Sequence, residues 1–227
     1  FEDQRIHRLE GIEPRPITPE PPAARAWRYA DATIVGDRVI VVREDHTAPG
    51  EARNDLVMVP IDGGAEPIVL AEGHDFYAAP AVDPTGTKVA WVAWNHPNMP
   101  WDHTEVWVGD LGDDGVDRVR SIPTSGESFT QPTWSPTGEL HVVSDRSGWW
   151  NLYCVSGDRL EPVRPDESEY GVPAWFFGFR TYGFLPDGRI AAVAIRDGRA
   201  RLEIIDGATA HSVDLGGREA FGYWLTV

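Results

Sequence analysis

A turn of the form x-Pro-x-Gly recurs in this chain at intervals of about fifty residues. Its copies at residues 83–86, 135–138 and 185–188 start 135 − 83 = 52 and 185 − 135 = 50 residues apart. A weaker copy at 35–37 begins 83 − 35 = 48 residues earlier. Proline presets φ at one turn position and glycine accepts a positive φ at another, so each copy predicts a tight hairpin between two strands.

Each hairpin is followed by the same series of segments. An apolar second strand comes first, then a third strand, then a more polar fourth segment, as in residues 89–94, 105–110 and 117–122. No segment shows a sustained 3.6-residue apolar period, so we expect almost no helix. Four antiparallel strands repeated about every 40–50 residues are typical of a β-propeller blade. The sequence therefore predicts an all-β propeller of four-stranded antiparallel blades.

The repeat also predicts how the chain is divided. We expect a single domain spanning 1–227, with about four complete blades and a partial blade at each end. Its expected parts are a partial blade at 1–20, blades at 29–73, 79–122, 131–165 and 180–215, and the start of a further blade at 219–227. One interpretation is a fragment of a longer propeller. The other is a closed ring of about five blades, which would be one strand short, so the fragment is favoured. Open blade edges predict self-association.

Charge and composition exclude several classes of function. The formal net charge is 20 − 36 = −16, which repels phosphate backbones, so we expect no nucleic acid partner. No apolar run approaches the length of a membrane span, so no membrane partner is expected. The single cysteine, Cys154, excludes an internal disulfide and fits a reducing compartment. Residues 1–10 are charged throughout and do not resemble a signal peptide, so a cytoplasmic location is expected.

Four strings carry a family resemblance: DFYAAP at 75–80, WNHPNMPWD at 94–102, QPTWSP at 131–136 and SDRSGWWNLY at 144–153. Together they resemble the N-terminal β-propeller of bacterial prolyl oligopeptidase family serine peptidases, the dipeptidyl aminopeptidase and acylaminoacyl-peptidase group. The resemblance covers essentially the whole chain. The second and fourth strings are long and unusual, which makes them the most specific.

The resemblance implies a C-terminal α/β-hydrolase domain with a Ser, Asp, His triad. It also implies that the propeller caps the active site of that domain and admits only short peptides to it. The chain itself has no Gly-x-Ser-x-Gly elbow, and the nearest string, at 126–130, ends in Thr. We therefore expect no catalytic residue and no cofactor in this chain. The expected partners are the hydrolase domain and a peptide substrate. In some relatives propeller carboxylates hold the substrate's amino terminus, but none here matches that role by motif.

Two loops supply the candidate contacts to substrate or to the hydrolase domain. Residues 95–104 lengthen a hairpin with an aromatic-bearing insertion, where ligand contacts are expected, although a self-packed loop is the alternative. Residues 146–151 place adjacent tryptophans in a strand, so the two side chains face opposite sides. One can therefore pack in the core while the other faces solvent, a neighbouring blade or a partner, and a purely structural role is the favoured alternative. The candidate residues are His96, Asn98, Met99, Trp101, Asp102, Arg146, Trp149 and Trp150.

Other groups have simpler interpretations. His74 and Asp75, and His96 with Asp102 and His103, lack the spacing of known metal sites, so we expect no metal. The run Trp-Phe-Phe at 175–177 is expected to anchor the next inner strand in the core.

Two further classes of function remain open. The first is a stand-alone propeller that binds a peptide, protein or glycan through its loops. The second is a propeller hydrolase or lactonase with a central metal, which is disfavoured because inner strands near 79–82 and 131–134 offer few carboxylates or histidines. The reading frame beyond residue 227 discriminates the peptidase interpretation from the stand-alone module, because only a peptidase continues into a hydrolase sequence.

Overall fold

The computed structural model describes residues 2–217 and 225–227. Within these residues the regular secondary structure consists of β-strands joined by turns and loops. Sixteen strands form four antiparallel four-stranded sheets, each with consecutive strands side by side. The sheets are blade 1, β3 (Trp27–Val35), β4 (Arg38–Asp45), β5 (Arg53–Pro60) and β6 (Ile68–Ala71); blade 2, β7 (Phe76–Val82), β8 (Lys88–Trp94), β9 (Glu105–Leu111) and β10 (Val116–Ser121); blade 3, β11 (Phe129–Trp134), β12 (Leu140–Ser144), β13 (Asn151–Ser156) and β14 (Arg159–Pro162); and blade 4, β15 (Tyr182–Phe184), β16 (Ile190–Arg196), β17 (Arg199–Asp206) and β18 (Thr209–Ser212). The predicted propeller with four complete blades is confirmed.

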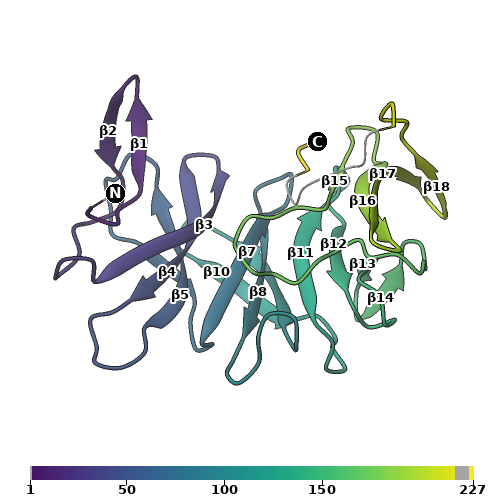
Figure 1. Ribbon diagram of the computed structural model, residues 1–227. Coiled ribbons are helices and arrows are strands. Elements are labelled where there is room, and N and C mark those ends of the chain that lie inside the picture. The colour runs from purple at the N-terminus through teal and green to yellow at the C-terminus, as the bar shows by residue number, and fades with distance from the viewer. Residues whose placement is uncertain (1, 218–224) are drawn as a thin grey trace.

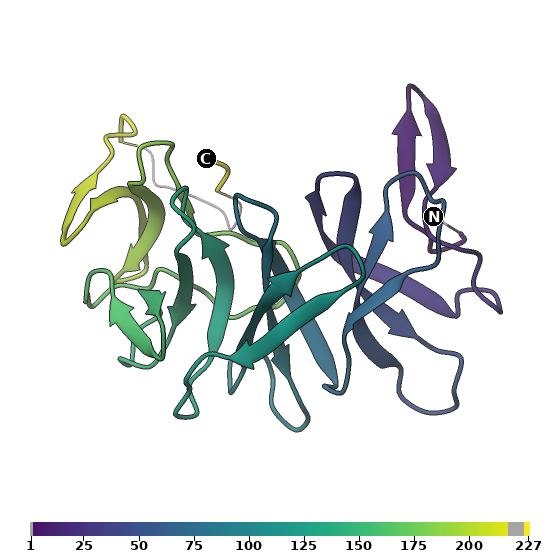
Figure 2. The ribbon, with the colours of Figure 1, turned by 180° about the vertical axis from the view of Figure 1, so that it is seen from behind.

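The blades stand side by side in an open arc (Figures 1 and 2). A separate hairpin of β1 (His7–Glu10) and β2 (Glu13–Pro16) lies beside blade 1, at the opposite end of the arc from blade 4. The described residues therefore do not form the closed five-blade ring that was the alternative. The further strand expected at 219–227 falls largely outside the described residues, although the Leu225 N–H donates to the Arg180 carbonyl at 2.8 Å.

The repeated turns owe their shape to local chemistry. In the first of them, Gly86 has a φ of +73°, which costs glycine little. The Asp83 carboxylate accepts hydrogen bonds from the N–H groups of Thr87 at 2.8 Å and Lys88 at 2.7 Å. Burial alone would raise the pKa of Asp83, but these bonds and those from Thr85 hold it below its ordinary value. A short polar string is therefore enough to define the hairpin.

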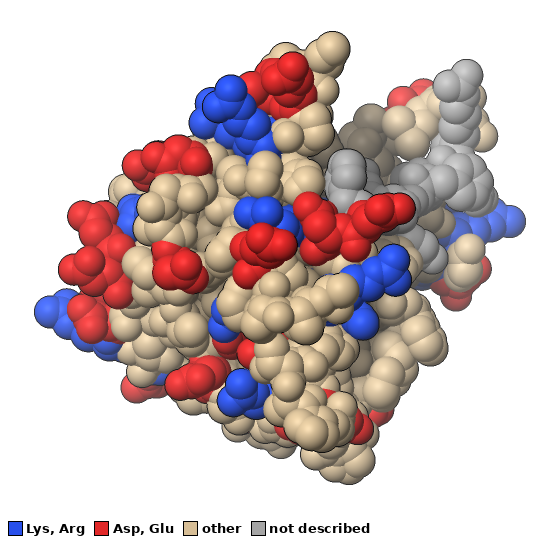
Figure 3. Space-filling model, turned by 90° about the vertical axis from the view of Figure 1, so that its left-hand side faces the viewer, with Lys and Arg blue, Asp and Glu red and all other residues tan. Residues whose placement is uncertain are grey.

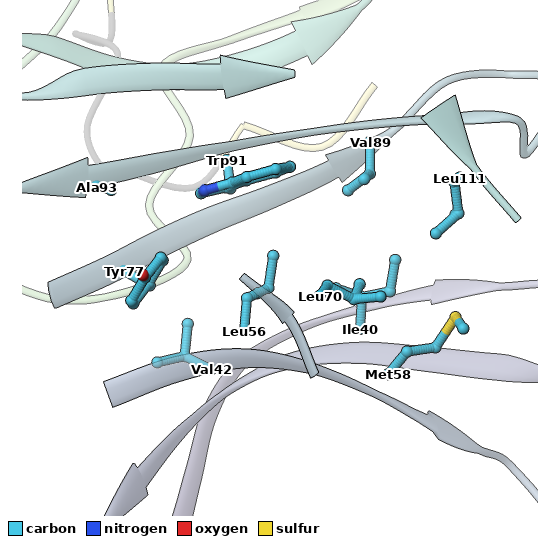
Figure 4. Close-up of a cluster of buried hydrophobic side chains, with 10 residues drawn as sticks. All are labelled: Ile40, Val42, Leu56, Met58, Leu70, Tyr77, Val89, Trp91, Ala93 and Leu111. Carbon is cyan, nitrogen blue, oxygen red and sulfur yellow. The ribbon is translucent and has the colours of Figure 1, made fainter. Parts of the chain in front are cut away.

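The core consists of layers between neighbouring blades. Figure 4 shows the layer in which Leu56 and Met58 of blade 1 face Val89 and Trp91 of blade 2. Trp91 is only 2% exposed. Similar layers separate blades 2 and 3 and blades 3 and 4. Because the second strands are covered on both faces, each of them contains a continuous buried run rather than an alternating pattern.

The outer face of blade 1 is partly covered by the N-terminal segment. Ile6 and Ile17 pack there against Val39, Val41 and Val57. Seen from this side, acidic and basic side chains are scattered among uncharged ones (Figure 3). Self-association through blade edges stays a prediction.

The long loops share one end of the propeller. In an antiparallel blade, the hairpin between the second and third strands and the connection to the next blade lie at the same end, opposite the x-Pro-x-Gly turns. We call it the loop end. It carries the insertion at 95–104, the hairpin at 145–150 and the connection at 163–181 between β14 and β15.

Candidate functional site

A cavity of about 480 Å³ lies against the inner strands, and we call it the aromatic pocket. Strands β3, β7, β8 and β11 supply one side of it, and the insertion at 95–104 and the connection at 163–181 supply the rest. Its aromatic lining consists of Trp94, Trp101, Phe129, Trp175, Phe176, Phe177 and Phe179. A smaller cavity of about 160 Å³ between blades 1 and 2 shares Trp94 and Phe177 with it.

The connection at 163–181 corrects the expectation for the Trp-Phe-Phe run. This segment crosses in front of the inner strands (Figure 1). Trp175 is 72% exposed, Phe176 44% and Phe177 48%, so these side chains do not anchor a strand in the core. They line the pocket instead. The signal in the sequence was the length of the aromatic, glycine- and proline-bearing stretch between the fourth strand of one blade and the next turn.

Two loops from different blades meet at the pocket through a pair of tryptophans. The rings of Trp101 and Trp175 have centroids 4.2 Å apart and an interplanar angle of 40°. Trp101 belongs to the insertion and is half-buried, whereas Trp175 belongs to the β14–β15 connection. The pocket therefore depends on the relative position of both loops.

Within the insertion, the candidates divide into two groups. Met99, 46% exposed, and Trp101 line the pocket. Asp102 holds the loop, because its Oδ2 accepts from the Met99 N–H at 2.9 Å and its own N–H donates to the Met99 carbonyl at 2.9 Å. The Asn98 N–H donates to the Asn95 carbonyl at 3.1 Å. Neither Asp102 nor Asn98 lines the pocket.

His96 faces a different neighbourhood. The backbone N–H of His96 donates to Asp75 Oδ2 at 2.9 Å, and the ring Nε2 of His96 lies 3.2 Å from Glu51 Oε2. Its ring meets Phe76 edge-on, with centroids 4.9 Å apart. His96 is thus tied to the neighbouring loops of blades 1 and 2 and lies outside the pocket lining.

The second group of candidates, around 146–150, also lies outside the pocket. The Arg146 guanidinium stacks over Tyr153, 5.7 Å from the ring centroid, and lies 3.6 Å from Glu127 Oε1. The backbone N–H of Trp150 donates to Glu169 Oε2 at 2.7 Å, and the Trp150 ring packs on the core between blades 3 and 4. Trp149 is 39% exposed. A contact role for these three residues stays a prediction.

Two charged groups stand at the aromatic pocket. Asp31 Oδ2 accepts a hydrogen bond from the Ala79 N–H, and Arg180 lies close enough for its charge to act on the carboxylate. Burial raises the pKa of Asp31, while this hydrogen bond and the charge of Arg180 oppose the rise. The lining residues, all of them described, include no His, Cys, Ser or Lys. This composition suits binding of an apolar group with a few polar contacts.

Other potential sites are poorly developed in the part of the chain that the structure describes. There, no three His, Cys, Asp or Glu residues are grouped so that they could hold a metal ion. Cys154 is half-buried, and burial raises the pKa of its thiol, which disfavours the reactive thiolate. None of the described residues forms a helix that could span a membrane.

Comparisons with known proteins agree with this architecture. The family model described as "Lipoprotein LpqB beta-propeller domain" matches residues 54–164. No curated protein sequence matches the chain. An acylaminoacyl peptidase from Pyrococcus horikoshii superposes on 86% of the chain with a TM-score of 0.59 but is only 16% identical, so it shows the fold alone.

Two solved structures are much more similar. A Mycobacterium tuberculosis puromycin-hydrolysing peptidase is 37% identical over 100% of this chain, with a TM-score of 0.90. A puromycin hydrolase is 31% identical over 100% of this chain, also with a TM-score of 0.90. The chain spans 37% of the length of each. The chain thus belongs to the prolyl oligopeptidase-family peptidases and corresponds to their propeller domain.

Proposed function

We propose that this chain is the noncatalytic propeller portion of a serine peptidase, which gates and positions peptide substrates for a C-terminal α/β-hydrolase domain. The aromatic pocket carries the proposal. It lies at the inner strands, it is lined by side chains from two long loops, and it offers an apolar surface with a carboxylate and a guanidinium close by. Such a surface binds a short peptide through its side chains.

The chemistry of this chain limits what it does alone. A nucleophile elbow places a serine on a strained turn between a strand and a helix, and the sequence contains no Gly-x-Ser-x-Gly string. Binding energy from the propeller therefore assists a reaction only by positioning the substrate against groups on another domain. This division of labour fits a chain that spans 37% of its puromycin-hydrolysing relatives.

Finer points belong to the same proposal. Release of short units from peptide ends, as by dipeptidyl aminopeptidases or acylaminoacyl-peptidases, fits a pocket of limited volume. A cytoplasmic location fits the single cysteine, Cys154. The domain bounds at 29–73, 79–122, 131–165 and 180–215 treat each repeat as one blade.

The test has two steps. Reading the gene past residue 227 should reveal about 250 further residues with Gly-x-Ser-x-Gly, then Asp, then His, in the order of an α/β-hydrolase. In the polypeptide that carries both domains, peptides with a large apolar residue should then be cleaved faster than glycine peptides of equal length. A stop codon directly after residue 227 would contradict the proposal and favour a stand-alone binding module.

A further inference from the structure

Neighbouring inner strands are joined by side chains at one repeated position, which we call the latch position. Its four occupants are spaced 79 − 31 = 48, 131 − 79 = 52 and 181 − 131 = 50 residues apart, and they are Asp31, Ala79, Gln131 and Thr181. The carboxylate of Asp31 accepts a hydrogen bond from the backbone N–H of Ala79 in the next blade. In the same way, Gln131 Oε1 accepts from the backbone N–H of Thr181 at 2.7 Å.

Blade 2 interrupts this pattern. Its latch residue, Ala79, has only a methyl group, which cannot accept a hydrogen bond from the backbone of Gln131. The β11–β12 ladder pairs Thr130 and Thr133 with β12 and leaves Gln131 outside its paired residues. Ala79 and Gln131 both line the aromatic pocket. Asp31, whose latch is intact, lines the pocket as well, so the pocket borders the intact latch between blades 1 and 2 and also the place where the latch between blades 2 and 3 is missing.

The backbone at Ala79 is also unfavourable for alanine. Its φ is +53°, close to the +57° of Asp31 and the +52° of Gln131. L-residues enter this left-handed region at a cost that is smallest for Gly, Asn and Asp. In blades 1 and 3 the side chain in this conformation makes the latch hydrogen bond, whereas the methyl group of Ala79 gains nothing from it. The backbone N–H of Ala79 does donate to Asp31, but the Ala79 side chain forms no latch of its own, and residues in this strained region of φ cluster at functional sites.

We propose that Ala79 is a specificity-determining residue that keeps the latch position open, so that a peptide inserts an apolar side chain into the aromatic pocket. A main-chain carbonyl of the bound peptide takes the place of the missing acceptor and receives the N–H of Gln131. The ligand class is a peptide residue with an aromatic or large aliphatic side chain. This inference rests on the proposed function and names the substrate class of its pocket.

Ala79→Asn tests the inference, because asparagine matches Asp31 in length, tolerates the left-handed backbone and carries a neutral acceptor. The probe is N-acetyl-phenylalanine amide, and calorimetry with tryptophan fluorescence measures its affinity for the chain. The variant should bind the probe at least about tenfold more weakly. Its Tm should rise by roughly 2–4 °C, the shift that about 1 kcal/mol gives in a domain of this size.

Ala79→Gly is the matched control. Glycine adopts a positive φ freely and adds neither bulk nor an acceptor, so this variant should retain probe binding. Loss of binding in the glycine variant as well would overturn the inference, because the latch would then not be the cause.

The remaining outcomes separate the two proposals. Equal probe binding by wild type and Ala79→Asn overturns the role of Ala79 and leaves the proposed function standing. A lower Tm for Ala79→Asn also overturns it, because the asparagine would then not have restored the latch. An absence of probe binding by the wild-type chain overturns the proposed use of the pocket, and with it this inference.

Discussion

The side chain of Gln131 and the backbone of Thr181 are hydrogen-bonded at 2.7 Å across the boundary between blades 3 and 4. Gln131 Nε2 also donates to Thr181 Oγ1 at 3.0 Å, and this hydroxyl donates to the carbonyl of Tyr170. Thr181 is only 1% exposed, so its partners have no ready access to water. A buried polar network of this kind stabilises only while every member is paired.

Thr181→Val should therefore destabilise the chain. The substitution keeps the shape of the side chain but leaves the carbonyl of Tyr170 and Nε2 of Gln131 without their partner, at a cost of about 1–3 kcal/mol. Urea unfolding measures the change. Thr181→Ser, which keeps the hydroxyl, is the control and should retain most of the stability. Equal losses in the two variants would show that the methyl group, rather than the hydroxyl, matters.

The latch also shows where sequence-based inference succeeds and where it ends. The x-Pro-x-Gly turns were predictable because φ requirements of proline and glycine act within four residues. The latch position was not, because its occupants are Asp31, Ala79, Gln131 and Thr181, which share no side-chain type. Their equivalence exists only in the backbone, in the left-handed φ of the first three and in hydrogen bonds between blades.

The candidate site was predictable in part for a similar reason. The insertion at 95–104 stood out as an extra length between two strands of known spacing, and Met99 and Trp101 from it do line the pocket. The run at 175–177 was misassigned because aromatic side chains are usually buried. Its exposure follows from the path of the β14–β15 connection, which depends on tertiary packing.

Asp166 predicts a pH dependence of stability. Burial opposes its charge, but hydrogen bonds and charge from Arg164, a bond from Tyr170 and the charge of Arg196 hold the pKa of this carboxyl below its ordinary value. The carboxylate therefore stabilises the fold above about pH 4, the ordinary Asp value, and this contribution is lost as the pH falls through the lower folded pKa.

Asp166→Asn should accordingly cost about 1.5–3 kcal/mol at pH 7, typical of hydrogen bonds to charged groups, and less at pH 3. Denaturant unfolding at both pH values measures this. Asp187→Asn is the control, because Asp187 also pairs with an arginine, Arg189, but its side chain is exposed. It should change stability little at either pH. A loss for Asp166→Asn that is the same at pH 3 and pH 7 would contradict the assignment.

The chain should not react with a fluorophosphonate probe. Such probes label serines activated by a neighbouring base, and the sequence lacks the elbow that presents one. Intact-mass analysis after incubation should show unmodified protein. Stoichiometric labelling of a single serine would contradict the noncatalytic assignment.

Trp101→Ala should lower peptide turnover more than stability in the polypeptide that carries this propeller with its hydrolase domain. Trp101 contacts Trp175 across the pocket, so its removal takes away apolar contact area from the bound peptide. Loss of such contacts lowers kcat/KM by about tenfold or more. Steady-state kinetics and thermal unfolding of the same preparation measure both effects.

Trp107→Ala is the matched control, since Trp107 is also half-buried but packs between blades 1 and 2. The control should lose stability and keep its kcat/KM. A large fall in Tm with unchanged kinetics for Trp101→Ala would instead show that the insertion only supports the fold.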